Sequence, residues 1–325
     1  MAHTNTLRSA STLLLLLGTA VAQTPARALT QMTVTGGTVQ ALAYSPRGDV
    51  LFAGDSAGHI DLWSRSGRSA GQLPQAAGVS ALAVSPDGHW LATAGTDGRL
   101  RVWNVASRRL QWEQAASSFF LTSVAFSPDS HTVATGGGGA VAGSGDTVKL
   151  WNVTAGTLRG TLNGHTDVVT AVAFDPSGAR LASGSRDRTV RLWRVDTLTP
   201  ERVLNGHSDF VSAVAFAPDG KTLASAGWDA SVLLWNPADG TRRAALNGHA
   251  GPVRSLTFSR DSSLLASGAD DRRILLWNAR TGGALGEVGR LADGVTALSF
   301  GPRNVLAGGS VQQVRAWQVT APASP

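Results

Sequence analysis

The sequence predicts an all-β fold, a seven-bladed β-propeller of four-stranded antiparallel blades. The first observation is a set of seven tryptophans spaced 40 to 48 residues apart, at Trp63, Trp103, Trp151, Trp193, Trp235, Trp277 and Trp317. The second is the common order of short stretches before them, such as VTAVAFDPSG followed by LASGS and TVRLW. Short alternating strands separated by turns, in repeats of this length, are typical of propeller blades.

The first 22 residues are predicted to be a secretory signal peptide. Arg8 supplies a positive charge, an apolar segment follows at 13–21, and Ala20-Val21-Ala22 fits the small-residue rule for cleavage after Ala22. A second motif of this kind at 26–28 leaves the cleavage point open. The apolar segment is too short to span a bilayer, and no cysteine follows it to carry a lipid. We therefore expect an exported protein, periplasmic or secreted, without a transmembrane anchor; a buried helix of the mature protein is the less favoured reading.

Residues 23–37 are expected to form a leader and the strand that closes the ring. The last repeat ends at Trp317-Gln318-Val319 and has three strands rather than four. A surplus strand, about Ala28–Thr35, precedes the first complete repeat. Pairing this strand with the last blade covers an otherwise exposed strand edge. The seven-repeat propeller then occupies residues 38–319, and residues 320–325 form a C-terminal tail.

The middle repeats resemble the WD40-repeat family, and the resemblance extends over about residues 30–319. Gly-His pairs precede three of the repeats, and the strands end in LWN, VWN or LWR where the family has Trp-Asp. A periplasmic propeller type built on SPDG turns, as at Ser85–Gly88, is the nearest alternative, but it lacks these elements. The resemblance implies structural tetrads in which Trp bonds Ser, Ser bonds His, and His bonds Asp. The expected tetrads are His165, Ser183, Asp187 and Trp193; His207, Ser225, Asp229 and Trp235; and His249, Ser267, Asp271 and Trp277.

Ser, His and Asp are also the residue types of a hydrolytic triad. A catalytic triad requires a solvent-open serine next to an oxyanion hole. Here the three sets are equivalent, with Asp always six residues before Trp and Ser always four before Asp. Three identical copies favour a structural role, because a buried indole N–H and a buried polar network need internal partners. We expect no catalytic residue in them.

The other repeats depart from this pattern. Repeat two has Thr93, Asp97 and Trp103, but QAAGV where Gly-His is expected. Repeat three has Asp146 only five residues before its tryptophan, after the glycine-rich insertion Gly136–Gly145, which is read as an inert surface loop or, less favoured, a binding loop. Repeats one and seven lack both the Gly-His pair and the correctly spaced Asp. We expect the ring to be held best at blades four to six.

The composition excludes several classes of site. There is no cysteine, which excludes disulfides, thiolate catalysis and zinc–cysteine sites. The net charge of +6 comes from arginines spread over every repeat, with no basic and aromatic run suited to nucleic acid. The stretch DSAGHID at Asp55–Asp61 is interpreted as a degenerate blade turn rather than a metal site. We expect no metal, no cofactor and no nucleic-acid partner.

The remaining function is binding on a loop-lined face of a rigid disc. By resemblance, propellers of this family are scaffolds for proteins or peptides, which dock on the face that carries the Gly-His and Asp-turn loops. The residue before each turn Asp is expected to be exposed there, and Trp228 stands out because a large aromatic has no core role in a loop. The candidate partner-binding residues are Thr96, Arg186, Trp228 and Asp270.

We thus predict an exported, non-enzymatic scaffold that binds a protein and is monomeric on its own. Two other classes stay open at this point. An exported propeller enzyme would carry its active site in the central channel, and the sequence contains no His or carboxylate cluster for one. A binder of anionic cell-surface polymer would need a continuous positive patch.

Overall fold

The computed structural model describes residues 26–139 and 147–320. Residues 1–25, which include the predicted signal peptide with its cleavage point, residues 140–146, which include most of the glycine-rich insertion and Asp146, and the last five residues lie outside the described residues. The described chain is all-β, with one 3-10 turn, η1 (Pro302–Asn304), as its only helical element.

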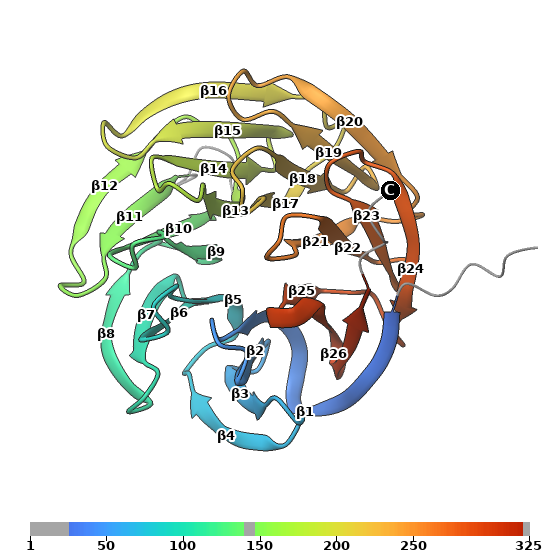
Figure 1. Cartoon of the computed structure of the whole chain (residues 1–325). Coiled ribbons are helices and arrows are strands. Elements are labelled where there is room, and N and C mark those ends of the chain that lie inside the picture. Colours follow the sequence, from blue (N-terminus) through green and yellow to red (C-terminus); the bar gives the residue numbers. More distant parts are fainter. Residues whose placement is uncertain (1–25, 140–146, 321–325) are drawn as a thin grey trace, which may run out of the picture.

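Seven blades surround a central axis, and the predicted propeller is confirmed (Figure 1). Blades two to six are separate four-stranded antiparallel sheets, with the first strand nearest the axis and the fourth outermost. Their strands are β5 (Val79–Val84), β6 (Trp90–Gly95), β7 (Arg99–Asn104) and β8 (Arg109–Ala115); β9 (Phe120–Phe126), β10 (Thr132–Gly138), β11 (Val148–Asn152) and β12 (Leu158–Leu162); β13 (Val169–Phe174), β14 (Arg180–Ser185), β15 (Thr189–Arg194) and β16 (Thr199–Asn205); β17 (Val211–Phe216), β18 (Leu223–Gly227), β19 (Ser231–Trp235) and β20 (Arg242–Asn247); and β21 (Val253–Phe258), β22 (Leu264–Ala269), β23 (Arg273–Asn278) and β24 (Ala284–Arg290).

Blades one and seven share one six-stranded sheet, which closes the ring. Its strands, in spatial order, are β25 (Ala297–Phe300), β26 (Val305–Val319), β1 (Ala26–Tyr44), β2 (Val50–Asp55), β3 (His59–Ser64) and β4 (Ser69–Pro74). The first part of β1 pairs with the end of β26, from Ala26 opposite Val319 to Thr33 opposite Gln313. The last part of β1 pairs with β2 and is the inner strand of blade one.

The N-terminal strand therefore completes the last blade, as predicted. This strand, β1, extends from Ala26 to Tyr44. It therefore crosses residue 37, where the boundary between leader and propeller was expected. The glycine-rich insertion also begins differently, because Gly136 to Gly138 still belong to β10 and pair with β9.

The apolar core lies between the blades. Buried side chains form seven clusters, and each cluster joins two neighbouring blades. Close packing explains the glycine in LASGS: a Cβ on Gly184 would lie 2.6 Å from a methyl group of Val211 on the next blade. At Gly268 the corresponding distance, to Val295, is 2.4 Å. Glycine lets the inner strand of each following blade approach closely.

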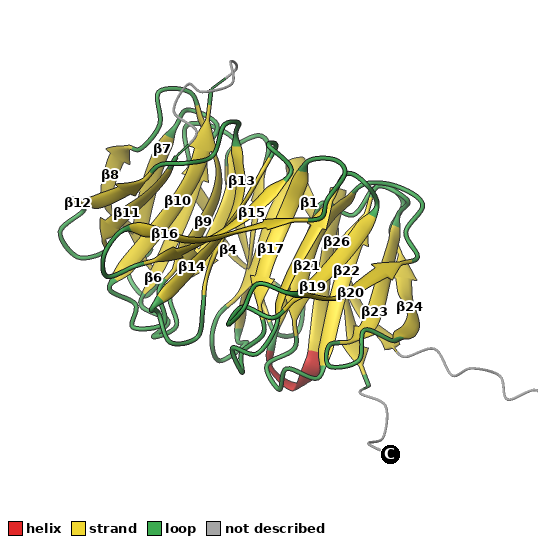
Figure 2. Ribbon diagram, turned by 90° about the horizontal axis from the view of Figure 1, so that it is seen from above, coloured by secondary structure: helices red, strands yellow, loops and turns green. Residues whose placement is uncertain are grey.

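The disc has two loop-covered faces (Figure 2). One face carries the turns between the second and third strands together with the loops that enter each blade. We call it the Asp-turn face; it includes residues 96–98, 186–188, 228–230 and 270–272. The opposite face carries the turns between the first and second strands and between the third and fourth strands.

Candidate functional site

Each of blades four, five and six holds a buried chain of four hydrogen-bonded side chains. In blade four the Trp193 indole N–H donates to Ser183 Oγ at 2.8 Å, His165 Nε2 lies 2.7 Å from the same oxygen, and His165 Nδ1 lies 2.7 Å from Asp187 Oδ2. The corresponding distances are 2.8, 2.8 and 2.9 Å in blade five and 2.8, 2.8 and 3.0 Å in blade six. The structure thus brings together all twelve tetrad residues named from the sequence.

A neutral imidazole suits this arrangement. Its Nδ1–H donates to the aspartate, and its Nε2 accepts the serine O–H, which leaves the serine oxygen free to accept from tryptophan. Burial lowers the pKa of His207 and His249 and outweighs the neighbouring carboxylates, which act in the opposite direction. Burial alone would raise the pKa of Asp187, Asp229 and Asp271, but hydrogen bonds from the histidine and from backbone and hydroxyl donors lower it overall.

The tetrads are closed to solvent. Ser183, Ser225 and Ser267 have no exposed surface, and each tetrad histidine side chain is 1% exposed. A substrate therefore has no access to the serine hydroxyl. The arrangement is structural: its hydrogen bonds connect the loops of the Asp-turn face to the tryptophan of the third strand.

Blade two has a shorter series of hydrogen-bonded side chains, which was not predicted from the sequence. Trp103 donates to Thr93 Oγ1 at 3.2 Å, and Thr93 donates to Gln75 Oε1 at 2.6 Å. Gln75 thus takes the place of the histidine, and it stands 18 residues before Thr93, the same spacing as His165 and Ser183. Asp97 lies apart from this chain and binds the buried Arg101, at 2.6 Å. This 18-residue spacing, which recurs in blades four to six, could have identified Gln75 from the sequence.

Blades three and one keep other parts of the network. In blade three Trp151 donates to Thr135 at 3.1 Å, while Asp146 lies outside the described residues. In blade one Asp55 is fully buried and accepts backbone N–H groups from Gly37, Ala57 and His59, and His59 Nδ1 lies 3.1 Å from it. The stretch DSAGHID therefore forms a hydrogen-bonded turn. Among the described residues, no group of three or more His, Cys, Asp or Glu side chains is placed to hold a metal.

The four candidate partner-binding residues share one backbone position on the Asp-turn face, and all four are exposed. Each one donates its N–H to a carbonyl of the loop that enters its blade, at 2.9 to 3.0 Å. The pairs are Thr96 with Gly78, Arg186 with Val168, Trp228 with Phe210, and Asp270 with Pro252. The turn geometry is thus the same in blades two, four, five and six.

Three of the four candidates belong to a continuous surface chain across blades four to six. The Arg186 guanidinium lies 5.9 Å from the ring centre of Phe210, and Phe210 lies 5.5 Å from Trp228. The Arg254 guanidinium covers Trp228 at 4.7 Å and binds Asp270 through two hydrogen bonds, at 2.9 and 2.7 Å. We call Arg186, Phe210, Trp228, Arg254 and Asp270 the ladder. Among the described residues, no such contact includes Thr96, which is on blade two.

Arg254 and Phe210 were not predicted from the sequence, although Arg254 breaks a pattern. The equivalent inner-strand residue is Thr or Ser in five other blades, Ser80 of blade two among them. In the other four its hydroxyl bonds a carbonyl of the next blade: Thr122 to Val169, Thr170 to Val211, Ser212 to Val253, and Thr296 to Val39. Blade six gives up this interblade bond. Its arginine instead reaches out to Trp228 and Asp270 on the surface.

Comparison with known proteins agrees with this geometry. The family model described as WD domain, G-beta repeat matches residues 68–104, 111–152, 156–194, 198–236 and 240–278, which together make up more than half of the chain. The first and last blades, which lack tetrads, lie largely outside these matches. No curated protein sequence matches the chain. In the part of the chain that the structure describes, no helix is long and apolar enough to cross a membrane. The chain belongs to the WD40-repeat family.

Proposed function

We propose that this chain is an exported, non-enzymatic scaffold that binds a protein partner on the Asp-turn face of blades four to six. WD40 propellers bind proteins in general. The observation that carries the proposal for this face is the ladder, in which a tryptophan is held between an aromatic ring and a paired arginine. The proposed partner residues are Trp228, Arg186 and Asp270, with Phe210 and Arg254 added. Thr96 lies on the same face but on blade two, and is a more distant candidate.

The state of Trp228 supports this role. Its side chain is 41% exposed, so a large apolar surface faces solvent. Phe210 and Arg254 fix the ring in place, and a fixed ring loses little conformational entropy when a partner covers it. Tryptophan and arginine are enriched among residues that dominate binding energy.

The surroundings of the ladder favour a partner with both apolar and charged groups. A depression of about 400 Å³ lies beside Arg186 and Phe210, and Asp167, Asp209 and Arg188 also line it. Both signs of charge therefore occur next to the aromatic pair. This mixture fits a protein or peptide surface better than a uniformly anionic polymer.

Export and a monomeric state are also part of the proposal. The proposal of export rests on the charged, apolar and small-residue segments of residues 1–22, and it includes cleavage after Ala22. A single chain closes the ring without help from a second copy, since the N-terminal strand covers the edge of the last blade.

Affinity capture from the exported fraction tests the binding face. Wild-type chain, Trp228→Ala and the control Leu158→Ala are used as baits, because Leu158 is a similarly exposed apolar residue at the start of the outermost strand of blade three. We expect Leu158→Ala to retain the partner and Trp228→Ala to weaken binding by about tenfold or more, since an aromatic anchor typically contributes about 2 kcal/mol. Unchanged binding by Trp228→Ala with a lower melting temperature contradicts the proposal.

A further inference from the structure

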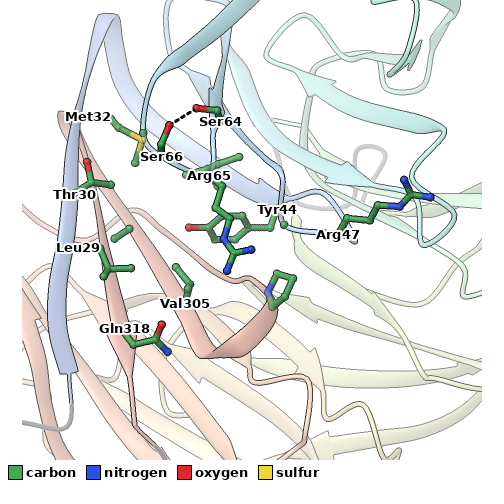
Figure 3. Close-up of a pocket in the computed structure, with 15 residues that line it drawn as sticks. Leu29, Thr30, Met32, Tyr44, Arg47, Ser64, Arg65, Ser66, Val305 and Gln318 are labelled. Carbon is green, nitrogen blue, oxygen red and sulfur yellow. Dashed lines mark hydrogen bonds between the residues drawn. The ribbon is translucent and has the colours of Figure 1, made fainter.

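A pocket of about 360 Å³ lies where the ring closes, between blades seven and one (Figure 3). Its lining comes from β1, β2, β3 and the turns β1–β2 and β3–β4 of blade one, and from η1 and β26 of blade seven. These turns belong to the face opposite the ladder, so the pocket is separate from the proposed partner site.

The pocket exists because one apolar side chain is replaced. In six blades the second residue after the repeat tryptophan is apolar and is buried or half-buried: Val105, Val153, Val195, Pro237, Ala279 and Val319. Five of these pack into the core cluster between their own blade and the preceding one. In blade one this residue is Arg65, which is exposed.

The backbone around Arg65 keeps the common geometry. Arg65 N–H donates to Asp49 O at 3.0 Å, as Val153 N–H does to His131 O. The turn that follows is one residue shorter, because Trp63 pairs with Ser69 whereas Trp103 pairs with Leu110. Because the backbone at Arg65 is in the usual position, the space that a valine side chain fills in blades two, three, four and seven stays open in blade one.

A second replacement faces the same space. The last residue of the inner strand is Phe in five blades and Val in blade two, but in blade one it is Tyr44, the only tyrosine of the chain. Among the described residues, the Tyr44 hydroxyl has no hydrogen-bond partner. The backbone N–H of Tyr44 donates to Ser299 Oγ at 3.3 Å. Burial raises the pKa of Tyr44 to about 12, so the phenol stays a neutral donor at physiological pH.

The two polar groups meet an apolar wall. Figure 3 shows Arg65 and Tyr44 reaching into the space framed by Leu29, Val305 and Gln318, whereas Arg47 extends away. Leu29 is 49% exposed at this edge, and Met32 and Leu51 line the interior. Arg65 makes no ion pair with any described residue. The pocket thus offers a free cation and a free hydroxyl donor next to apolar side chains.

We propose that this pocket binds a small carboxylate with an apolar body. The carboxylate oxygens accept from the Arg65 guanidinium and the Tyr44 hydroxyl, and the apolar body lies against Leu29, Met32, Leu51 and Val305. Arginine and a neutral hydroxyl donor are a matched pair for a carboxylate, and the volume is within the range of small-molecule sites.

Octanoate is the probe, and the single tyrosine is the reporter. With carbon-13 in the tyrosine ring, the full chain gives one set of ring signals, which we expect to shift saturably as octanoate is added. Octanol has the same apolar body without the charge. It should bind at least about tenfold more weakly, because a charge-assisted hydrogen bond is lost. Calorimetry on the same samples supplies the affinity.

Three variants make the test specific. Arg65→Val restores the side chain found in other blades and should abolish binding without lowering the melting temperature. Arg65→Met removes the charge but keeps the length, and should weaken octanoate binding about tenfold. Arg109→Ala, at an exposed arginine of blade two that does not line the pocket, is the control and should bind as the wild type does. The proposal is overturned if octanoate gives no saturable shift, if octanol binds equally well, or if both Arg65 variants bind as tightly as the wild type.

Discussion

Asp187→Ala is expected to lower stability by removing the acceptor of a buried histidine. Asp187 accepts from His165 Nδ1 at 2.7 Å, from the N–H groups of Thr166 and Thr189 at 3.2 and 2.9 Å, and from the Thr189 hydroxyl at 2.6 Å. The threonine donors are partly accessible and can bond water instead. The imidazole is 1% exposed and cannot, and the Thr189 hydroxyl, at 3.4 Å from Nδ1, is too distant to replace the carboxylate as a good acceptor.

The magnitude follows from this difference. One buried unsatisfied donor costs about 1–3 kcal/mol, and the lost threonine bonds add a little more, so we expect about 2–3 kcal/mol. For a domain of this size that corresponds to a melting temperature lower by roughly 3–5 °C. Circular dichroism at pH 7 measures the change, after sedimentation has shown that the variant is monodisperse.

Asp196→Ala is the control, because Asp196 is an exposed carboxylate of the same blade paired with Arg194 at 3.1 Å. It should melt with the wild type, since exposed ion pairs contribute little. If Asp187→Ala also melts with the wild type, the tetrads do not stabilise the blades. If it loses a hydrolytic activity while its stability is unchanged, the structural interpretation of Ser183 is wrong.

Three further predictions concern pH, closure and export. Because burial lowers the pKa of His207 and His249, the unfolded chain binds more protons below the ordinary histidine pKa of about 6.5. The melting temperature should therefore fall between pH 7 and pH 5. In the double variant His207→Gln/His249→Gln it should fall less steeply. Parallel curves of melting temperature against pH for the two proteins contradict this. Deleting residues 23–36 removes the strand paired with β26, and should lower the melting temperature and cause aggregation by light scattering, whereas an unchanged monomer argues against closure by this strand. Mass analysis of the exported chain should find Gln23 first, or Leu29, and an intact Met1 on an unexported protein refutes export.

Much of the fold could be predicted because repetition makes the sequence redundant. The tryptophan spacing and the alternating strands recur seven times, so each blade supports the assignment of the others. The missing fourth strand of the last repeat predicted the partner of β1. The three tetrads are what the resemblance to the WD40-repeat family implies, and their fixed spacing within each repeat allowed their residues to be named without knowledge of neighbouring blades.

Features that depend on contacts between blades could not be predicted in the same way. Gln75 bonds Thr93 within its own blade, but it differs from histidine in residue type, so only its distance along the sequence from Thr93 marks it. Arg254 meets Trp228 across a blade boundary. The pocket at the ring closure depends on Arg65 and Tyr44 facing one space, although each is an unremarkable surface or strand residue in the sequence.

The proposed docking of a protein on the ladder is tested most directly by hydroxyl-radical footprinting of the chain alone and bound to its captured partner. The method reads side-chain exposure, and Trp228 and Leu158 are both exposed in the free chain. We expect partner binding to protect Trp228 and Phe210 severalfold and to leave Leu158 as reactive as before. Oxidation of Trp228 that is equal in the free and bound chain, with protection elsewhere on the disc, would contradict it.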